Sequence, residues 1–425
     1  MSSLAVLILI LLVVGILLRI DFIFYIFYVT SGIYIWSRWV MPRAFRNVRF
    51  ERTFTDHAFL REVIPVRITL RNEGRVPLPW LQITESVPPE LSSGRRPNYA
   101  LSLGGGERTA FTYKVRATRR GYYRLGPLFV RMGDLFGWQQ QNAQSGLSYL
   151  TVYPRIIPLS QLGLPSRLPF GTIASNQRLF EDPARPNGVR DYRSGDSLRQ
   201  INWKVSAHSN QLVVKTLQPA IALDTAIMLN LSAGDYSRRA RYSAPEWAIE
   251  IAASLAAHLI ERKQAVGLAT NAQDPLLQLR SAPDAAGAFD AVSGRLLLAG
   301  EDAAFVPPPI PPRTGRDHLM KILELLARVE AGRNAPPFAS WLPGATVHLS
   351  WGATLPVITP TADEALVQAL HRLVRAGYNP LLLLVETSIH FGEIRQRARQ
   401  LGFTAFQVAA QKDLDVLQSP QPAQR

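Results

Sequence analysis

The chain begins with two apolar stretches separated by a short polar break. Residues 4–18 carry no charge, and after Arg19 and Asp21 a second uncharged stretch continues to Trp36. A helix that spans a bilayer needs about 20 mainly apolar residues, and residues 1–18 and 20–40 approach that length. One unbroken helix would be about twice as long as a bilayer is thick. We therefore predict a transmembrane helical hairpin over residues 1–40, with one span plus an interfacial segment as the alternative.

The region after this hairpin has the pattern of a sheet that is buried on one side. Between about 47 and 155, apolar and polar residues alternate in short segments, which are separated by turn sequences such as the three glycines at 104–106. No helical period interrupts these segments. Short strands at this spacing predict an all-β sandwich of the Ig-like kind over residues 45–155.

From about residue 220 the period changes. Buried-strand patterns at 221–232, 265–270, 346–351, 380–386 and 404–408 alternate with amphipathic helical patterns at 245–263, 317–331, 362–377 and 392–401. Strands that alternate with helices predict a mostly parallel sheet covered on both faces. We assign residues 221–410 to this α/β domain and residues 156–220 to a connecting region.

Two segments of this part have the composition of linkers. An insert at about 271–315 ends in a proline-rich run, "PPPIPPR" at 307–313, which favours the polyproline II conformation of a stiff connection. Residues 411–425 are rich in Gln and Pro, and we predict a flexible tail there.

Composition narrows the function classes. The chain has no cysteine, which excludes disulfides and thiolate zinc sites. Its seven histidines are scattered without metal-ligand spacing, and no P-loop, H-E-x-x-H or G-x-S-x-G motif occurs. The net charge of +15 indicates an anionic partner. Because the arginines are not interleaved with aromatic residues along one element, we expect no nucleic acid, and the apolar N-terminus favours a membrane.

The positive charge nearest the hairpin predicts its orientation. Five arginines follow the second apolar stretch, at Arg38, Arg43, Arg46, Arg49 and Arg52, whereas the turn carries one Arg and one Asp. Basic residues flank membrane segments on the cytoplasmic side, so we expect the folded domains in the cytoplasm. The arginines Arg38, Arg43, Arg46 and Arg49 are candidates for binding anionic lipid headgroups.

The densest run of distinctive residues is "GVRDYRSGDSLRQINWK" at 188–204. Its start alternates like a strand, and the turn after it leads to a predicted helix from Ser197 with Asp196 as N-cap. Ile201 would lie on the apolar face of that helix, and Arg199 could stack on Trp203 one turn later.

Two interpretations of this run remain open. Arg190, Arg193 and Arg199 near a helix N-terminus could bind an anion. Alternatively, these arginines pair with neighbouring aspartates and carbonyls and hold the fold together. We favour the structural interpretation, because Asp196 occupies the place that an anion would take.

The same run resembles the signature of domain-of-unknown-function family 58, which reads G-x-R-x-Y-x-x-G-D-x-x-R-x-I-x-W-x-x-[ST]-A. The residues that match are Gly188, Arg190, Tyr192, Gly195, Asp196, Arg199, Ile201, Trp203, Ser206 and Ala207. Upstream, residues 119–138 are similar to the family's R-G-x-Y-x-L-G-P…D-x-F-G segment. The position after Ala207, an arginine in the family, is His208 here.

The resemblance implies a membrane hairpin, a β-sandwich and a Rossmann-type α/β domain like von Willebrand factor A. It also implies a bacterial protein of the cytoplasmic (inner) membrane whose genetic neighbour is a MoxR-type AAA+ ATPase. No catalytic residue is established for the family.

A von Willebrand A domain often binds Mg²⁺ through D-x-S-x-S after its first strand. In this chain Asn230, Ser232 and Gly234 stand at those three positions. An amide brings no charge to balance a dication, and glycine brings no side chain. We therefore expect a degenerate site at Asn230 and Ser232 with neither metal nor cofactor, unless Asp235 turns inward.

These observations lead to one functional hypothesis and one alternative. We expect a non-enzymatic, membrane-anchored adaptor whose α/β domain docks a MoxR-type AAA+ ATPase or its client. The alternative is an enzyme of the cell envelope or an Mg²⁺-dependent hydrolase.

Overall fold

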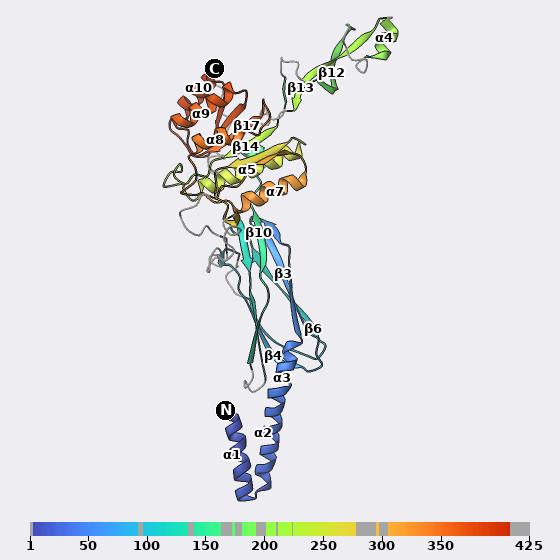
Figure 1. The fold of residues 1–425 in the computed structure, drawn as a ribbon, viewed down its shortest axis with the longest axis vertical. Coiled ribbons are helices and arrows are strands. Elements are labelled where there is room, and N and C mark those ends of the chain that lie inside the picture. The colour runs from blue at the N-terminus through green and yellow to red at the C-terminus, as the bar shows by residue number, and fades with distance from the viewer. Residues whose placement is uncertain are drawn as a thin grey trace. The chain divides into compact units, whose positions relative to one another are not determined.

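The protein is described by a computed structural model, in which residues 3–91, 97–134, 140–162, 172–174, 181–192, 201–209, 211–222, 224–277, 295–296 and 305–408 can be described (Figure 1). The chain forms two compact units. One comprises Met1–Tyr153 with Ala286–Leu297, and the other Pro154–Ala285 with Leu298–Arg425.

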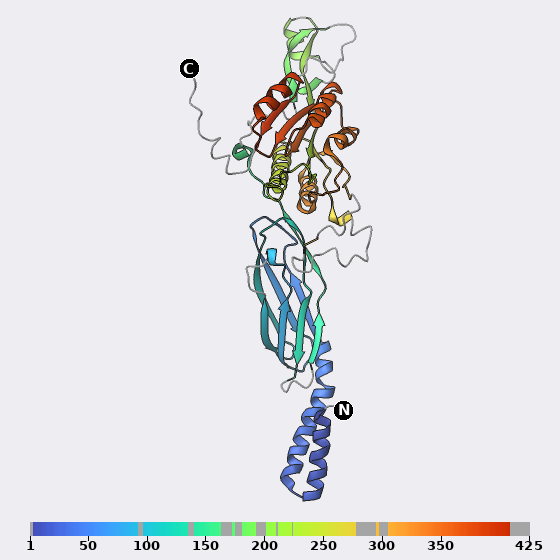
Figure 2. The same cartoon turned by 90° about the vertical axis from the view of Figure 1, so that its left-hand side faces the viewer.

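The first unit begins with a helical hairpin, as the sequence predicts. Helices α1 (Ser3–Leu18) and α2 (Asp21–Trp39) pack side by side and are joined at Arg19, whose φ of 51° reverses the chain; α3 (Met41–Arg46) follows (Figures 1 and 2). The prediction that these helices span a bilayer is not supported. In the described part of the chain, no helix combines the length and the apolar character that crossing a membrane requires. Helix α1, with 16 residues, is about 24 Å long, against about 30 Å of hydrocarbon.

Mainly antiparallel strands form the rest of the first unit, in agreement with the alternating pattern. The sheets have the orders β1-β3-β6, β2-β10-β7 and β5-β4-β8-β9. One apolar core lies between them, to which β3 contributes the alternate residues Ile64, Val66, Ile68 and Leu70. The strands are β1 (Val48–Thr53), β2 (His57–Phe59), β3 (Val63–Asn72), β4 (Leu78–Glu85), β5 (Asn98–Leu103), β6 (Arg108–Arg116), β7 (Gly121–Leu125), β8 (Leu128–Gly133), β9 (Gln140–Gln144) and β10 (Ser148–Tyr153).

An ion pair is buried among these strands. Arg52 of β1 and Glu85 of β4 approach to 2.6 Å, with 2% and 0% of their side chains exposed. Burial raises the pKa of Glu85, and the nearby Tyr113 hydroxyl and the charge of Arg52 oppose the rise. Arg52 also donates from Nη1 to the Leu125 carbonyl at 3.2 Å. Arg52 is therefore buried among the strands, unlike the exposed Arg38, Arg43, Arg46 and Arg49.

The guanidinium of Arg52 also explains why a glycine is present in the sequence "RLGP" at residues 124–127. Gly126 has a φ of +94°, and a Cβ at this position would lie 2.8 Å from Nη2 of Arg52. A larger residue would be strained by its backbone and would displace the buried arginine.

A short piece of the insert belongs to the first unit. Arg295 forms an antiparallel bridge with Tyr123 of β7, and the Leu296 amide donates to the Tyr122 carbonyl at 2.9 Å. The side chain of Arg295 is buried, and a Cβ on Gly121 would lie 3.0 Å from its Nε. Gly121 therefore leaves room for Arg295.

The second unit begins with a small antiparallel sheet of order β11-β13-β12. Its strands are β11 (Thr172–Ala174), β12 (Glu181–Asp191) and β13 (Val213–Ala222), and α4 (Trp203–Ser209) lies between the last two. The strand predicted at the start of the signature run is thereby confirmed by β12.

The α/β domain follows, with a six-stranded sheet of order β16-β15-β14-β17-β18-β19. All neighbouring strands are parallel except the pair β15–β16. Helices α8 and α9 cover the face that carries Ala226 and Met228, while α5, which contacts β14 and β15, packs with α7 (Figure 2). The elements are β14 (Thr225–Leu229), α5 (Ala244–Glu261), β15 (Val266–Thr270), β16 (Ile310–Arg313), α7 (Arg316–Arg328), α8 (Phe338–Thr346), β17 (Thr354–Thr359), α9 (Glu364–Arg375), β18 (Asn379–Leu384), α10 (Phe391–Gln400) and β19 (Thr404–Gln407).

Two element predictions in this domain are wrong. The strand predicted at 346–351 lies at the end of α8 and in the turn after it, and the true strand is β17. Pro356 in the middle of β17 argues against a central strand, but the ladder to β14 has no pair at this residue and resumes at Val357. The proline-rich end of the insert, read as a linker, forms the edge strand β16, a position where proline is tolerated.

The buried ion pair gives a stability prediction. Glu85→Ala leaves the Arg52 charge without its partner inside the core, and we expect a loss of about 3–5 kcal/mol in the free energy of unfolding. Glu73→Ala is the matched control, because Glu73 pairs with Arg49 at 3.5 Å on the surface and its loss costs below about 1 kcal/mol. Chemical denaturation of the purified chain measures both, and equal losses would contradict a structural role for the buried pair.

Candidate functional site

A crevice lies at the carboxyl ends of β14 and β17. From β14 the chain proceeds to β15 on one side and returns to β17 on the other, so the direction of strand addition reverses between β14 and β17. In open α/β sheets, ligands bind in the crevice at such a switch point. The crevice has a volume of about 450 Å³. It is lined by Asn230, Asp235, Pro337, Phe338, Ala339, Ser340, Thr359, Thr361, Asp363, Ala365, Leu366, Gln368 and Arg372.

The side-chain amide of Asn230 organises the inner end of this crevice. Its Nδ2 donates to Asp235 Oδ2 at 2.8 Å and to Thr359 Oγ1 at 3.1 Å. Its Oδ1 accepts from the Ser232 amide at 3.0 Å and from Asn271 Nδ2 at 3.3 Å. Asn230 is 1% exposed, and two donated and two accepted hydrogen bonds use the full capacity of its amide.

A second set of polar groups holds this amide in place. The Tyr236 hydroxyl donates to the Asn230 carbonyl at 2.7 Å. Burial, together with the nearby charges of Glu386 and Asp235, raises the pKa of Tyr236 well above its usual value, so the hydroxyl keeps its proton. Asn271 accepts from the Leu231 amide at 2.8 Å and donates to the Pro336 carbonyl at 3.0 Å. The inner end is therefore rigid.

The mouth of the crevice carries a second carboxylate. Asp363 is the N-cap of α9, and its Oδ1 accepts from the Leu366 amide at 2.9 Å. Neither Asp235 nor Asp363 forms an ion pair with any residue that the structure describes. The donors of Asn230 are already used, so Asp235 and Asp363 contribute acceptors to the crevice, while Gln368 and Arg372 add donors to its lining.

This arrangement does not suit a metal ion. A cation would have to lie among the Asp235, Thr359 and Asn230 oxygens, but the amide hydrogens of Asn230 point at the first two. Within the described residues, no group of three or more His, Asp or Glu side chains could hold a metal. Asp235 does turn toward Asn230, yet it accepts a hydrogen bond there.

Sequence reasoning missed Thr359, Asn271 and Asp363. Thr359 was missed because the strand that ends there was placed at 346–351. Asp363 had a usable signal, since an aspartate before an amphipathic helical pattern is typical of an N-cap.

The structure distributes the signature run over a strand, a bridge and a helix. Gly188 pairs with Thr216 and Arg190 with Val214 in the ladder of β12 and β13, and the Tyr192 amide donates to the Leu212 carbonyl at 2.8 Å. Gly195, Asp196 and Arg199 lie outside the described residues, so the predicted cap and stacking stay predictions.

One further prediction for this run is wrong. Ile201 forms an antiparallel bridge with Val214 instead of a helical turn, and α4 begins at Trp203, where the Asn202 side chain accepts from the Val205 amide at 3.4 Å. The side chain of Trp203 is 66% exposed. Ser206 supports the structural interpretation, since its Oγ accepts from the Val213 amide at 2.9 Å and ties α4 to β13.

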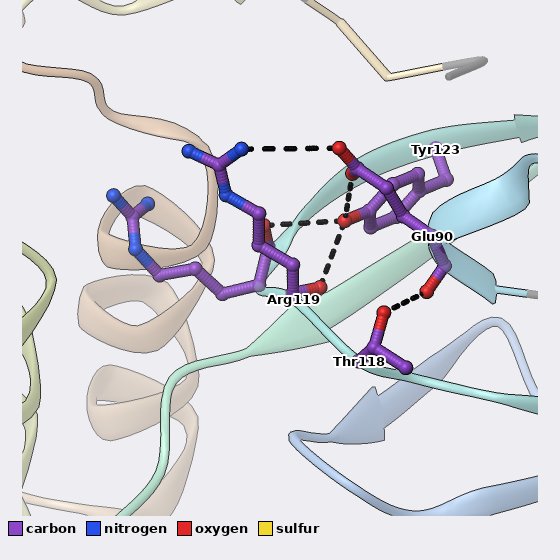
Figure 3. Close-up of polar contacts among 5 residues, drawn as sticks. Glu90, Thr118, Arg119 and Tyr123 are labelled. Carbon is purple, nitrogen blue, oxygen red and sulfur yellow. Dashed lines mark hydrogen bonds and ion pairs between the residues drawn. The ribbon is translucent and has the colours of Figure 1, made fainter. Parts of the chain in front are cut away.

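The upstream segment that is similar to the family, residues 119–138, begins with side chains that contact Glu90. The Tyr123 hydroxyl donates to Glu90 Oε2 and also lies 2.8 Å from the Arg119 carbonyl, while Arg119 Nη1 is 3.8 Å from Glu90 Oε1 (Figure 3). Thr118 donates to the Glu90 carbonyl. Burial is the main cause that raises the pKa of Tyr123, so this hydroxyl stays protonated. The cluster fixes the turn before β7 and presents no nucleophile.

The amide network predicts how the crevice responds to Mg²⁺. We expect millimolar Mg²⁺ to leave the melting temperature of the wild-type chain unchanged. Asn230→Asp replaces a donor by a carboxylate beside Asp235, which costs about 1–3 kcal/mol without metal. Mg²⁺ should restore part of this loss, because a ligand that binds only the native state stabilises it.

Thermal unfolding with Mg²⁺ and with EDTA checks both statements. A rise in the wild-type melting temperature with Mg²⁺ that Ser232→Ala abolishes would contradict the degenerate site.

Comparison with known proteins gives a family for part of the chain. Residues 188–289 match the family described as "Protein of unknown function DUF58". Over 210 residues the chain is 24% identical to the uncharacterized protein YeaD of Bacillus subtilis (strain 168), a match that covers 48% of this chain and 51% of YeaD. The chain thus spans about half the length of this relative.

Similarity to solved structures is weak. Alpha-2-macroglobulin from Escherichia coli, from domain MG7 to the C-terminus, is 18% identical over 26% of this chain and 17% of that chain, with a TM-score of 0.23. A CARDB domain from Pyrococcus furiosus in complex with di-metal ions is 16% identical over 25% of this chain and 86% of that chain, with a TM-score of 0.19. Scores this low carry no argument about function. The chain carries a DUF58 family domain at residues 188–289 and is a distant homologue of YeaD.

Proposed function

We propose that this protein is a non-enzymatic adaptor that attaches to a membrane through α1 and α2 and binds a partner protein in the crevice between β14 and β17. The crevice is the observation that carries the proposal. It lies at the switch point of an open α/β sheet, and its inner polar groups are already hydrogen-bonded to one another. A site of this kind can recognise a ligand by the shape of the crevice and by the charges of its lining.

The chemistry of the crevice supports binding over catalysis. Its lining residues include no histidine, lysine or cysteine, and no hydroxyl in the lining is hydrogen-bonded to a general base in the part of the chain that the structure describes. Ser340 and Thr359 donate to backbone carbonyls. The alternative of an envelope enzyme or Mg²⁺-dependent hydrolase lacks such support, because the Asn230 amide occupies the place of a charged metal ligand.

The free acceptors indicate which partner segment would fit. Asp235 and Asp363 are both in the lining, and neither has a described cationic partner. A lysine or arginine side chain of a partner would satisfy these two acceptors, and a partner carboxylate would pair with Arg372, which also lines the crevice. The resemblance to family 58 makes a MoxR-type AAA+ ATPase or its client the expected partner.

The surface of the hairpin supports attachment to lipid. Large apolar side chains are exposed along both helices, among them Leu9, Ile16 and Leu17 on α1 and Phe22 and Val29 on α2. Water-exposed apolar surface of this extent marks a site of interaction with a membrane or a protein.

The arginines next to the hairpin favour the membrane and indicate its orientation. Arg38, Arg43, Arg46 and Arg49 are exposed and would pair with anionic lipid headgroups. We propose the cytoplasmic face of the bacterial inner membrane for the folded domains, because the anionic lipids of that leaflet attract exposed arginines. A C-terminal reporter that is active only outside the cytoplasm would contradict this orientation.

Substitution inside the crevice tests the adaptor. Thr361→Trp places an indole in the mouth and should abolish capture of the partner from detergent-solubilised membranes without lowering the melting temperature. Asp363→Asn keeps the N-cap and removes the charge, so capture should weaken and lose its salt dependence.

Ile389→Trp is the matched control for these variants. Ile389 is 99% exposed in the loop before α10 and does not line the crevice. Mass spectrometry of the captured proteins gives the readout. Equal capture by the Thr361→Trp variant and the wild type would refute crevice binding.

A further inference from the structure

A pocket lies where the hairpin meets the β-sheets of the first unit. It is lined by Ile33, Trp36, Ser37, Met41, Pro77, Pro79 and Asp134 and has a volume of about 200 Å³. The first four residues belong to α2 and α3, and the prolines lie at the start of β4, against which α3 packs. The pocket therefore forms only when the hairpin and the sheets are in contact.

The polar groups of this pocket are turned toward each other. Ser37 Oγ donates to Asp134 Oδ2, and each of these residues is 3% exposed. The Asp134 carbonyl accepts from Trp80 Nε1 at 3.0 Å. Because the Ser37 hydroxyl is directed at Asp134, the rest of the lining presents hydrocarbon from Ile33, Trp36, Met41 and the prolines. A pocket of this character takes an apolar group.

The surroundings of the pocket suit an amphiphile with a negative charge. Trp36, a lining residue, is 51% exposed, and Trp39 on the next turn is 64% exposed. Arg43 donates from Nη1 to the Trp39 carbonyl at 2.8 Å, with its guanidinium 5.8 Å from the Trp39 ring. Arg38 is exposed one residue beyond Ser37. Tryptophan and arginine side by side are typical of the level of lipid headgroups.

We propose that this pocket binds one acyl chain of an anionic phospholipid, whose phosphate pairs with Arg38 or Arg43. This inference rests on the proposed attachment of the hairpin to lipid. The exposed helices contact the apolar interior of the membrane without selecting a lipid. The pocket, in contrast, selects a single lipid and holds it where the hairpin meets the sheets. The selected lipid is distinguished by its charge, because the arginines require a phosphate without a compensating cation.

Native mass spectrometry of the full chain in detergent tests the pocket. The probes are phosphatidylglycerol, which is anionic, and phosphatidylcholine, which is zwitterionic. We expect the wild type to retain one phosphatidylglycerol, and Ile33→Trp, which fills the pocket, to weaken retention at least about tenfold, since several methylenes lose their burial. Arg43→Gln should weaken retention of phosphatidylglycerol alone.

Two variants serve as matched controls. Ile35→Trp places the same ring on the same helix outside the pocket, since Ile35 is 58% exposed and is not part of the lining. Arg67→Gln removes an exposed arginine of β3 that is not part of the lining. Both should retain the lipid as the wild type does. Wild-type retention by both Ile33→Trp and Arg43→Gln would overturn the proposal.

Flotation with vesicles of phosphatidylglycerol and phosphatidylcholine separates this proposal from membrane attachment. The wild type and the Ile33→Trp variant should both float, because the apolar helices remain. Flotation of the wild type without any stoichiometric lipid in the mass spectrum would overturn the pocket and leave the attachment standing. A wild type that does not float would overturn both.

Discussion

The four hydrogen bonds of the Asn230 side chain determine what the α/β domain can do. The amide donates to a carboxylate and a hydroxyl and accepts from a backbone amide and a second asparagine, all within hydrogen-bonding distance. A carboxylate at this position would face Asp235 and require a cation between them. A neutral amide removes that requirement, and the polar groups at the carboxyl ends of β14, β15 and β17 hydrogen-bond to one another. The crevice beside it stays open, with acceptors at its mouth.

The first unit also contains buried polar groups that are paired with each other. Burial requires this pairing, because water cannot reach these groups. Arg52 and Glu85 share the interior of the sheets, and Gly126 leaves room for the guanidinium. Ser37 and Asp134 join α2 to the end of β8 in the same way. A buried charge or polar group without its partner costs several kcal/mol, so each pair fixes the register of the elements that carry it. The root of the hairpin is thereby a defined structure, and the pocket beside it has fixed walls.

How far the sequence predicts this structure depends on how local each signal is. The hairpin turn at Arg19, the alternation in β3 and the amphipathic helix α9 are local patterns, and all three were predicted. The strand β17 was misplaced because Pro356 argues against a central strand, and only the neighbouring strands β14 and β18 reveal that the missing donor is tolerated. The edge strand β16 was missed for a related reason. Its prolines are typical of a linker, and only the position of β15 beside them shows that they form a strand.

The candidate site shows the same limit. Asn230, Ser232 and Asp235 could be proposed because the resemblance implies a von Willebrand A metal motif at these positions. Thr359 and Asn271 join them from the ends of strands far along the chain. Ile201 was expected on the apolar face of a helix, yet it forms a bridge with Val214, a residue 13 positions further along the chain. The roles of Arg52 and Glu90 also depend on partners from distant strands. Residues that act through long-range contacts cannot be assigned from local pattern.

Site-specific photo-crosslinking in intact membranes would test most directly whether the crevice binds a partner. A photoreactive phenylalanine at Thr361 reports contacts at the mouth of the crevice, and the same residue at Ile389 reports on an exposed loop outside its lining. We expect one discrete crosslinked species from position 361 and none from position 389. No crosslink at position 361, or the same species from both positions, would contradict a binding site between β14 and β17.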